Sequence, residues 1–126
     1  MKKKYLKCLP NQRPTVKQLD KLWNKVIKLR AKGESEYKHI PDSYLAAHHI
    51  IGKITNSLRW NLDNGVCITV GQHKFVAHHT GRAKKFKEWA LKTRGVYEED
   101  LELTAYNQVD RFLMKEYLER KIKEYE

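Results

Sequence analysis

Apolar residues recur at helical spacing in the first third of the chain, between residues 15 and 32. Thr15 and Gln18 have the spacing of a capping box at the start of this stretch, and Gly33 follows its end. The pattern therefore predicts an amphipathic helix over 15–32 that buries one face in the core. The apolar positions that carry it are Val16, Leu19, Leu22, Trp23, Val26, Ile27 and Leu29.

A β-hairpin is predicted in the middle of the chain. A polar loop over 34–43 leads to a short, apolar, β-compatible stretch over 44–51, and a second such stretch spans 66–70. Residues 63–65, with the letters DNG, supply turn chemistry just before the second stretch. The propensities become helical from Gly71 onward, so two strands with a polar connection and a following helix are expected.

Helical patterns dominate the rest of the chain. One helix is predicted from Arg82 to Thr93, with Gly95 as its stop signal, and an amphipathic helix from about 107 to 124. The last helix can pack on its own chain or on a second copy, so a monomer and a homodimer through this helix are both open. The length suits one compact domain of the α+β class over 1–126.

The balance of charge favours a polyanionic partner. Lys and Arg number 26 against 15 Asp and Glu, which gives a formal net charge of +11. Such a charge attracts nucleic acid, although an acidic membrane or an acidic protein would satisfy the charge alone. No stretch approaches the ~18–20 consecutive apolar residues that a membrane span needs, and no signal-peptide apolar region follows the basic N-terminus. A cytoplasmic protein without membrane contact is therefore expected.

Cysteine usage excludes two classes of scaffold. Only Cys8 and Cys67 are present, far apart and in no CxxC pair. A disulfide framework or a four-cysteine zinc ribbon is excluded on this count.

Histidines are concentrated in the predicted hairpin and in the helical stretch after it. Five of the six lie between residues 48 and 79. His48 and His49 are adjacent, Asn64 follows fifteen residues after the pair, and nine residues after that comes His73. Neutral imidazoles are ligands for Zn, Ni, Mn and related divalent ions, and one imidazole of such a group can stay free as a base. Because adjacent strand residues point to opposite faces, the members of the pair can serve different tasks.

In three segments the chain resembles an HNH endonuclease, and it is most similar in character to the small HNH nucleases of phages and mobile elements. The segments are 47–51 (AHHII), 62–66 (LDNGV) and 72–73 (QH), with His78 beyond. The resemblance covers about residues 44–92 and implies a ββα-metal (His-Me finger) core with flanking helices. The single nuclease domain would comprise a basic arm (1–13), an N-terminal helix and loop (14–43), the core (44–95) and a helical extension (96–126).

The resemblance implies a metal-dependent endonuclease that hydrolyses phosphodiester bonds of double-stranded DNA, by nicking or by cleavage. His48 matches a metal ligand of the catalytic site, His49 the general base and His73 a second ligand. Asn64 matches the motif Asn, which fixes the loop holding the base in some relatives and touches the metal in others. One divalent ion, Mg²⁺, Mn²⁺, Ni²⁺ or Zn²⁺, would act at the scissile phosphate. The alternative is a non-catalytic DNA-binding protein that keeps an HNH-like finger.

Two departures from the family's pattern change the expected site. Many relatives hold a structural zinc with CxxC pairs, whereas Thr69 and Gln72 stand at the positions of the second pair here, so no structural zinc is expected. The third ligand often lies four residues after the final motif His, but that position is Ala77. His78 and His79 are the alternatives, each well over 90° from His73 around an ideal helix. We expect His78 as the ligand, with an irregular turn or with the regular helix starting after His73, and we expect His79 to meet DNA or solvent.

Basic residues near the predicted site are candidates for contacts with the DNA backbone, although any one of them can be an ordinary solvated charge. Two lie in the connection of the hairpin, and three lie at the start of the helix at 82–93, whose N-terminal amides can add to phosphate binding. They are Lys53, Arg59, Arg82, Lys84 and Lys85. Trp60 is expected to be buried and His39 to lie on the surface.

Overall fold

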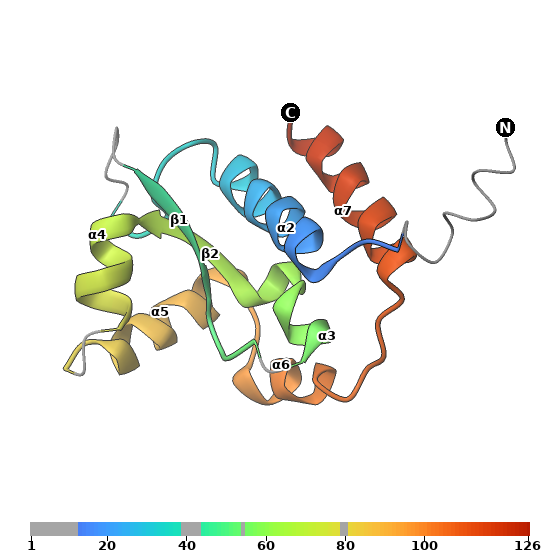
Figure 1. Cartoon of the computed structure of the whole chain (residues 1–126). Helices are drawn as coiled ribbons and strands as arrows, with labels where there is room; N and C mark the ends of the chain where they lie inside the picture. Colours follow the sequence, from blue (N-terminus) through green and yellow to red (C-terminus); the bar gives the residue numbers. More distant parts are fainter. Residues whose placement is uncertain (1–12, 39–43, 54, 79–80) are drawn as a thin grey trace, which may run out of the picture.

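Helices cover both faces of a two-stranded antiparallel sheet (Figure 1). The computed structural model of the protein describes residues 13–38, 44–53, 55–78 and 81–126. The mixture of helix and sheet confirms the α+β class. The elements in chain order are α2 (Val16–Arg30), β1 (Leu45–His49), α3 (Asn56–Arg59), η1 (Leu62–Asn64), β2 (Gly65–Thr69), α4 (Val70–Gln72), η2 (His73–Ala77), α5 (Ala83–Arg94), α6 (Glu98–Thr104) and α7 (Arg111–Tyr125).

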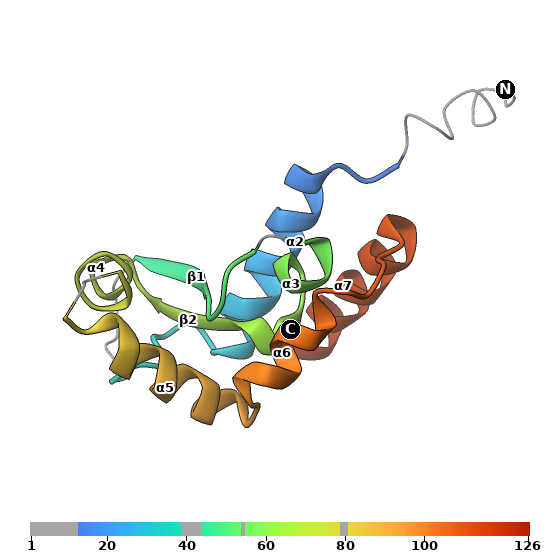
Figure 2. The ribbon, with the colours of Figure 1, turned by 90° about the horizontal axis from the view of Figure 1, so that it is seen from below.

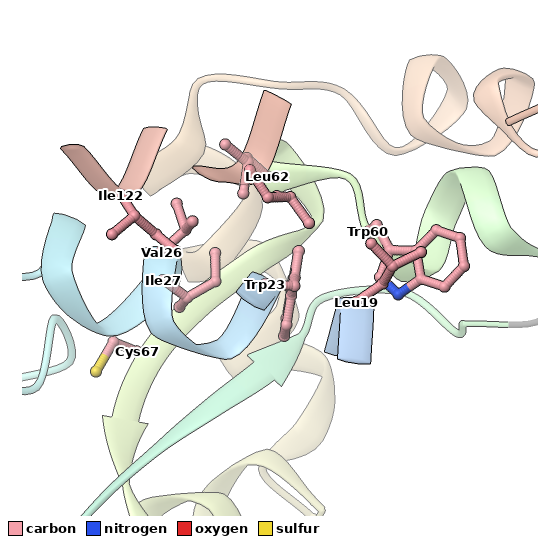
Figure 3. Packing of buried hydrophobic residues seen from close by; sticks show 9 residues of the cluster. Leu19, Trp23, Val26, Ile27, Trp60, Leu62, Cys67 and Ile122 are labelled. Carbon is pink, nitrogen blue, oxygen red and sulfur yellow. The ribbon is translucent and has the colours of Figure 1, made fainter. Parts of the chain in front are cut away.

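Helix α2 forms where the sequence predicts a helix, and its start has the predicted cap. The Thr15 hydroxyl accepts from the Gln18 amide at 3.1 Å, and the Gln18 side chain accepts from the Thr15 amide at 2.9 Å. Helix α7 lies alongside α2, so the C-terminal helix packs on the body of its own chain (Figure 1). It begins at Arg111 rather than near 107, because the Asp110 carboxylate caps it there. Figure 3 shows part of the core that the two helices share with β2, including Trp23, Val26, Ile27, Cys67 and Ile122.

Strand β2 is buried on both faces, and its side chains alternate between two cores. Cys67 belongs to the core of α2 and α7, whereas Val66 and Ile68 belong to a second core on the side of α5. Figure 2 shows α5 across the sheet from α2. The second core comprises Ile50, Val66, Ile68, Ala77, Phe86 and Ala90.

Gly65, the first residue of β2, brings the strand close to α2. Its backbone is extended, with φ −140° and ψ 145°, so the turn expected over 63–65 ends one residue earlier. A Cβ at this position would lie 2.5 Å from Cζ2 of Trp23 and 2.7 Å from Cδ1 of Ile27. Glycine is required here by the close approach of the helix rather than by a turn.

Several elements differ from the sequence-based expectation. Helix α3 forms in the connection that was expected to be a polar loop, and α6 lies within the predicted helical extension (96–126) but before the one helix, at about 107–124, that was placed in it. Helix α6 carries Glu98, Glu99 and Asp100 in its first turn, where the helix dipole favours negative charge. The helical stretch after β2 is irregular, because α4 is followed by one π-helical turn, η2. Within the described ranges, no helix has both the length and the apolar character needed to cross a bilayer.

Candidate active site

A cleft of about 610 Å³ opens between α2, β1, η2 and the start of α5. Four histidines line it, and these are the motif histidines together with the expected third ligand. His39 and His79 lie outside the described residues. The side chains that line the cleft include Asp20, Trp23, Asn24, His48, His49, Lys53, His73, His78, Phe86 and Lys87.

Three of these histidines form a cluster that could hold a metal ion. His48 comes from β1, and His73 and His78 stand at the start and just past the end of η2. One ring nitrogen from each lies within 4.8 Å of the others, and the Nε2 atoms of His73 and His78 are 3.1 Å apart. Two nitrogen ligands at ~2.1 Å from one ion in tetrahedral geometry lie about 3.4 Å apart. The spacing therefore fits a single divalent ion.

The π-helical turn explains how residues five apart come together. In an α-helix of ~3.6 residues per turn, residues 73 and 78 would point about 140° apart. The wider turn of a π-helix, with hydrogen bonds from i to i+5, brings the side chain of His78 back over that of His73. Of the two alternatives left open for His73, the irregular turn is the one found, and it places His78 beside His73.

The surroundings keep two members of this cluster, His48 and His73, in the protonation state that binds metal. Burial, together with the nearby rings of His73 and His78, lowers the pKa of His48 to about 3. Burial and then His78 also lower the pKa of His73. Phe86 lies edge-on to the His48 ring, with centroids 5.4 Å apart, and shields it from water. Both imidazoles are thus neutral near pH ~7, as metal ligands must be.

His49 faces the other way, toward α2, as strand alternation requires. Its Nε2 lies 2.8 Å from the backbone oxygen of Arg59. Because a carbonyl can only accept, Nε2 carries the proton, and Nδ1 of the neutral ring is unprotonated. The ring is stacked on Trp23, with centroids 4.1 Å apart and planes 5° apart. Burial lowers the pKa of His49, and this outweighs the bond to Arg59, which raises it.

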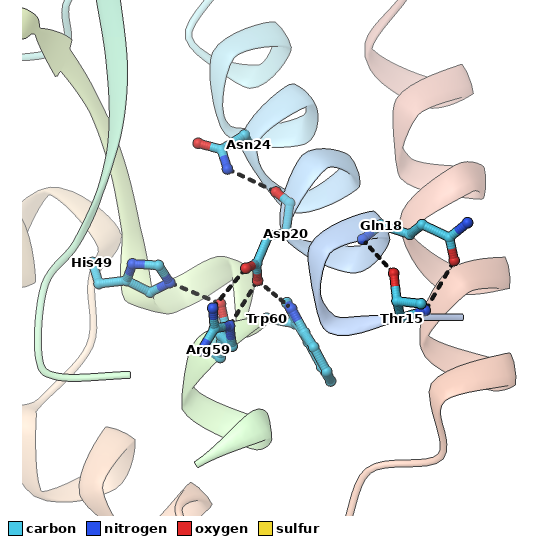
Figure 4. Close-up of polar contacts among 7 residues, drawn as sticks. All are labelled: Thr15, Gln18, Asp20, Asn24, His49, Arg59 and Trp60. Atoms are coloured by element: carbon cyan, nitrogen blue, oxygen red, sulfur yellow. Dashed lines mark hydrogen bonds and ion pairs between the residues drawn. The ribbon is translucent and has the colours of Figure 1, made fainter. Parts of the chain in front are cut away.

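Asp20 of α2 holds the segment that provides this carbonyl (Figure 4). Its carboxylate accepts from Nε and Nη2 of Arg59, at 2.7 Å and 2.6 Å, and from Nε1 of Trp60 at 2.9 Å. Burial alone would raise the pKa of Asp20, but the hydrogen bonds from Arg59 and Trp60 leave it lowered. The guanidinium of Arg59 is engaged by Asp20 within the protein, and the expected contact of Arg59 with DNA stays a prediction. Trp60 is fully buried, as expected.

Asn64 lies outside the cleft lining and is completely buried. Its Oδ1 accepts from the Ile51 amide at 2.8 Å, and its Nδ2 donates to the carbonyls of Ile51 at 3.2 Å and Leu58 at 3.0 Å. The side chain thus ties Ile51, just after β1, to Leu58 in α3. Of the two roles that the resemblance left open, the geometry matches the one that fixes a loop.

Of the other basic residues predicted to contact DNA, one lines the cleft and three lie at the start of α5. Lys53 is exposed and lines the cleft, and Arg82, Lys84 and Lys85 are exposed at the start of α5. Helix α5 begins there without a side-chain cap on its amides. Lys87 forms an ion pair with Glu98 at 2.5 Å.

Sequence reasoning missed Asp20 and assigned Trp23 to the core alone. Asp20 is the one acidic residue of α2, but nothing local connects it with Arg59, which is 39 positions away. Comparison of the chain with protein-family models, curated proteins and solved structures gave no match. The functional assignment therefore depends on the residues and their geometry.

Proposed function

We propose that this protein is a metal-dependent endonuclease of the HNH type that hydrolyses phosphodiester bonds of double-stranded DNA. One observation carries the proposal: a cluster of His48, His73 and His78 shares a cleft with His49, whose Nδ1 is unprotonated. The order of hairpin and helical stretch, with the adjacent histidines on β1 and His73 after β2, agrees with a ββα-metal finger. The net charge of +11 suits a DNA substrate.

The cluster would hold one divalent ion through three neutral imidazoles. Such a donor set suits Zn²⁺, Ni²⁺ or Mn²⁺ better than Mg²⁺, which prefers oxygen ligands. When bound, the ion would neutralise charge on the scissile phosphate and stabilise the leaving 3′ oxygen. Lys53 at the rim of the cleft would add a further contact to the backbone.

His49 would act as the general base. Its Nδ1 takes a proton from the attacking water as the new P–O bond forms and the bond to the 3′ oxygen breaks. The imidazolium that results keeps its Nε2–H bond to the Arg59 carbonyl, and that bond strengthens once the donor is charged. The face of Trp23 stabilises the same cation. Asn64 and Asp20 do no chemistry and hold the backbone around His49.

A plasmid-nicking assay tests the proposal. Supercoiled plasmid is incubated with the protein and Mn²⁺, Ni²⁺, Zn²⁺ or Mg²⁺, with a chelator in parallel. Cleavage should require metal, and His49→Ala should lower its rate by roughly 10²–10⁴ while metal binding persists. His48→Ala, at the preceding position of β1, is the matched comparison and should lose metal affinity. DNA binding without cleavage under any metal would instead make the protein a non-catalytic DNA-binding module.

A further inference from the structure

The outer face of α2 carries a row of lysines. Because residues three and four apart lie on one face of a helix, these side chains share one face. All are exposed, and α2 has only one acidic residue, Asp20, which is bound to Arg59. Within the described part of the chain, the acid that pairs with the row is Glu126, 3.9 Å from Lys25. The row consists of Lys17, Lys21, Lys25, Lys28 and, just past the helix end, Lys32.

Helix α7 offers a contrast, because two of its three lysines have acidic partners on the same helix. Lys115 pairs with Glu119 and Lys121 with Glu124, each at 3.4 Å. The charges of Lys115 and Lys121 are thus compensated within α7, whereas the α2 row has, among the described residues, its one ion pair at Lys25. The uncompensated charge gives α2 the stronger local attraction for a polyanion.

The α2 row borders the active-site cleft. Asp20, Trp23 and Asn24 line that cleft from one side of α2. Asn24 also lines a second hollow, of about 860 Å³, whose other walls include Lys21, Lys28 and Tyr125. The two hollows therefore adjoin at Asn24. On the far side of the cleft stand the exposed Lys53 and the basic start of α5, so positive charge flanks the cleft on both sides.

We propose that the α2 row binds the sugar–phosphate backbone of the duplex whose scissile bond enters the cleft. This inference rests on the proposed function, because it takes double-stranded DNA as the ligand. Positions 17 to 28 rise ~16 Å along the helix axis. One strand of a B-form duplex carries about five phosphates over that length. The row thus extends binding beyond the residues around the histidines, without reading sequence.

The test compares two variants of equal net charge in the full chain. One is Lys17→Gln/Lys21→Gln/Lys28→Gln, in the row. The control is Lys115→Gln/Lys121→Gln/Lys123→Gln, on α7. Affinity for a fluorescein-labelled duplex is measured by anisotropy at several salt concentrations, with a chelator present. The row variant should bind ~10-fold or more weakly, and its log–log salt slope should shrink by about 0.9 for each phosphate that it no longer neutralises.

The control variant should keep an affinity close to that of the wild type. Equal reductions of affinity in the two variants would mean that net charge alone matters and would overturn the inference, as would wild-type affinity in the row variant. Because binding is measured without metal, absence of cleavage by the wild type would refute the proposed function but not this comparison. At saturating DNA, the row variant should retain the wild-type single-turnover rate of cleavage; a lower rate with unchanged affinity would also overturn the inference.

Discussion

The imidazole of His49 lies flat against the indole of Trp23, with ring centroids 4.1 Å apart and planes 5° apart. The indole is itself fixed, because its Nε1 donates to the Asn61 carbonyl at 3.0 Å. A residue of the hydrophobic core thus orients the proposed base, and the Arg59 carbonyl sets which ring nitrogen is protonated. The flanking helix α2 is therefore part of the proposed active site as well as of the scaffold.

Asp20→Asn should slow catalysis without weakening metal binding. The change removes the charge that holds Arg59, so the carbonyl that orients His49 becomes less well placed. A misplacement of ~1 Å can cost up to about 10²-fold in rate, and we expect a loss of about 10-fold or more in kcat. The affinity for DNA should not fall, because a negative charge has been removed. Nicking kinetics and calorimetric metal titration measure these quantities.

Glu98→Gln is the matched control for that change. It breaks the ion pair between Lys87 and Glu98, whose side chains are similarly exposed; Lys87 lines the cleft, but no hydrogen bond among the described residues joins this pair to the segment around His49. Its kcat should equal that of the wild type. Equal reductions of kcat in Asp20→Asn and Glu98→Gln would show that Asp20 has no specific positioning role.

The carboxylate of Asp20 also predicts that the stability of the fold depends on pH. The pKa of Asp20 is lowered from its ordinary value of 3.8 in the folded protein, because the hydrogen bonds from Arg59 and Trp60 outweigh the effect of burial. A carboxylate whose pKa is lowered in the folded protein stabilises the fold at pH values above its ordinary pKa. This contribution is lost as the pH falls through the pKa of the folded state. Urea unfolding should find Asp20→Asn less stable than wild type near pH ~6 and should find the difference diminished near pH ~2. A difference that did not change with pH would contradict the role of the ionised carboxylate.

The sequence predicts those parts of the fold whose signals are local. The capping box of Thr15 and Gln18 and the stop at Gly95, which has φ +70°, are short-range features, and both are found. The hairpin follows from two nearby β-compatible stretches. The facing of His48 and His49 toward different helices follows from strand alternation, and so it could also be predicted.

The parts that could not be predicted depend on contacts between distant segments. The bond of Asp20 to Arg59 and the stacking of Trp23 on His49 join α2 to the hairpin, and a single sequence has no periodicity that encodes such pairs. Helix α6 was not placed as a separate helix within the predicted extension, because seven residues give too short a pattern. The spacing of His73 and His78 did indicate an irregular turn, but not that the turn would be π-helical.

Gly65→Ala should destabilise the fold, because the new Cβ would meet Trp23 and Ile27 at 2.5–2.7 Å. Neither the indole nor the buried Ile27 can move freely, so overpacking of about 1–3 kcal/mol is expected. Gly71→Ala is the control, since the nearest atom to its Cβ would be Oγ1 of Thr69 at 3.8 Å. Urea unfolding should give Gly65→Ala a clearly lower free energy of unfolding than Gly71→Ala. Equal stabilities would contradict the close approach of α2 to β2.

Cys67 should be inert in the folded protein. It is fully buried, and burial together with the nearby Glu36 raises the pKa of its thiol to about 11. The thiolate is the reactive form, so little of it exists near pH ~8. In a Cys8→Ser variant, in which Cys67 is the remaining thiol, iodoacetamide should label the denatured protein rapidly and the native protein hardly at all. Rapid labelling of the native variant would show that the core around β2 opens readily.

His78→Ala and His79→Ala should differ sharply in metal affinity, although the residues are neighbours. The π-helical turn sets Nε2 of His78 3.1 Å from Nε2 of His73, which makes His78 the third ligand of the proposed metal site. Mutation of a residue that only supports a metal ligand already lowers metal affinity by ~10-fold or more. His78→Ala removes a proposed ligand, so its metal affinity should fall by at least that factor. Excess metal should partly restore its nicking activity, as it should for His73→Ala, whereas His49→Ala should not be rescued because its defect is in proton transfer. His79→Ala should bind metal as the wild type does.

Calorimetric titration beside a nicking time course gives metal affinity and cleavage rate on the same samples. Weak metal binding in His79→Ala with normal binding in His78→Ala would mean that the ligand is His79 and that the π-helical turn has no part in the metal site.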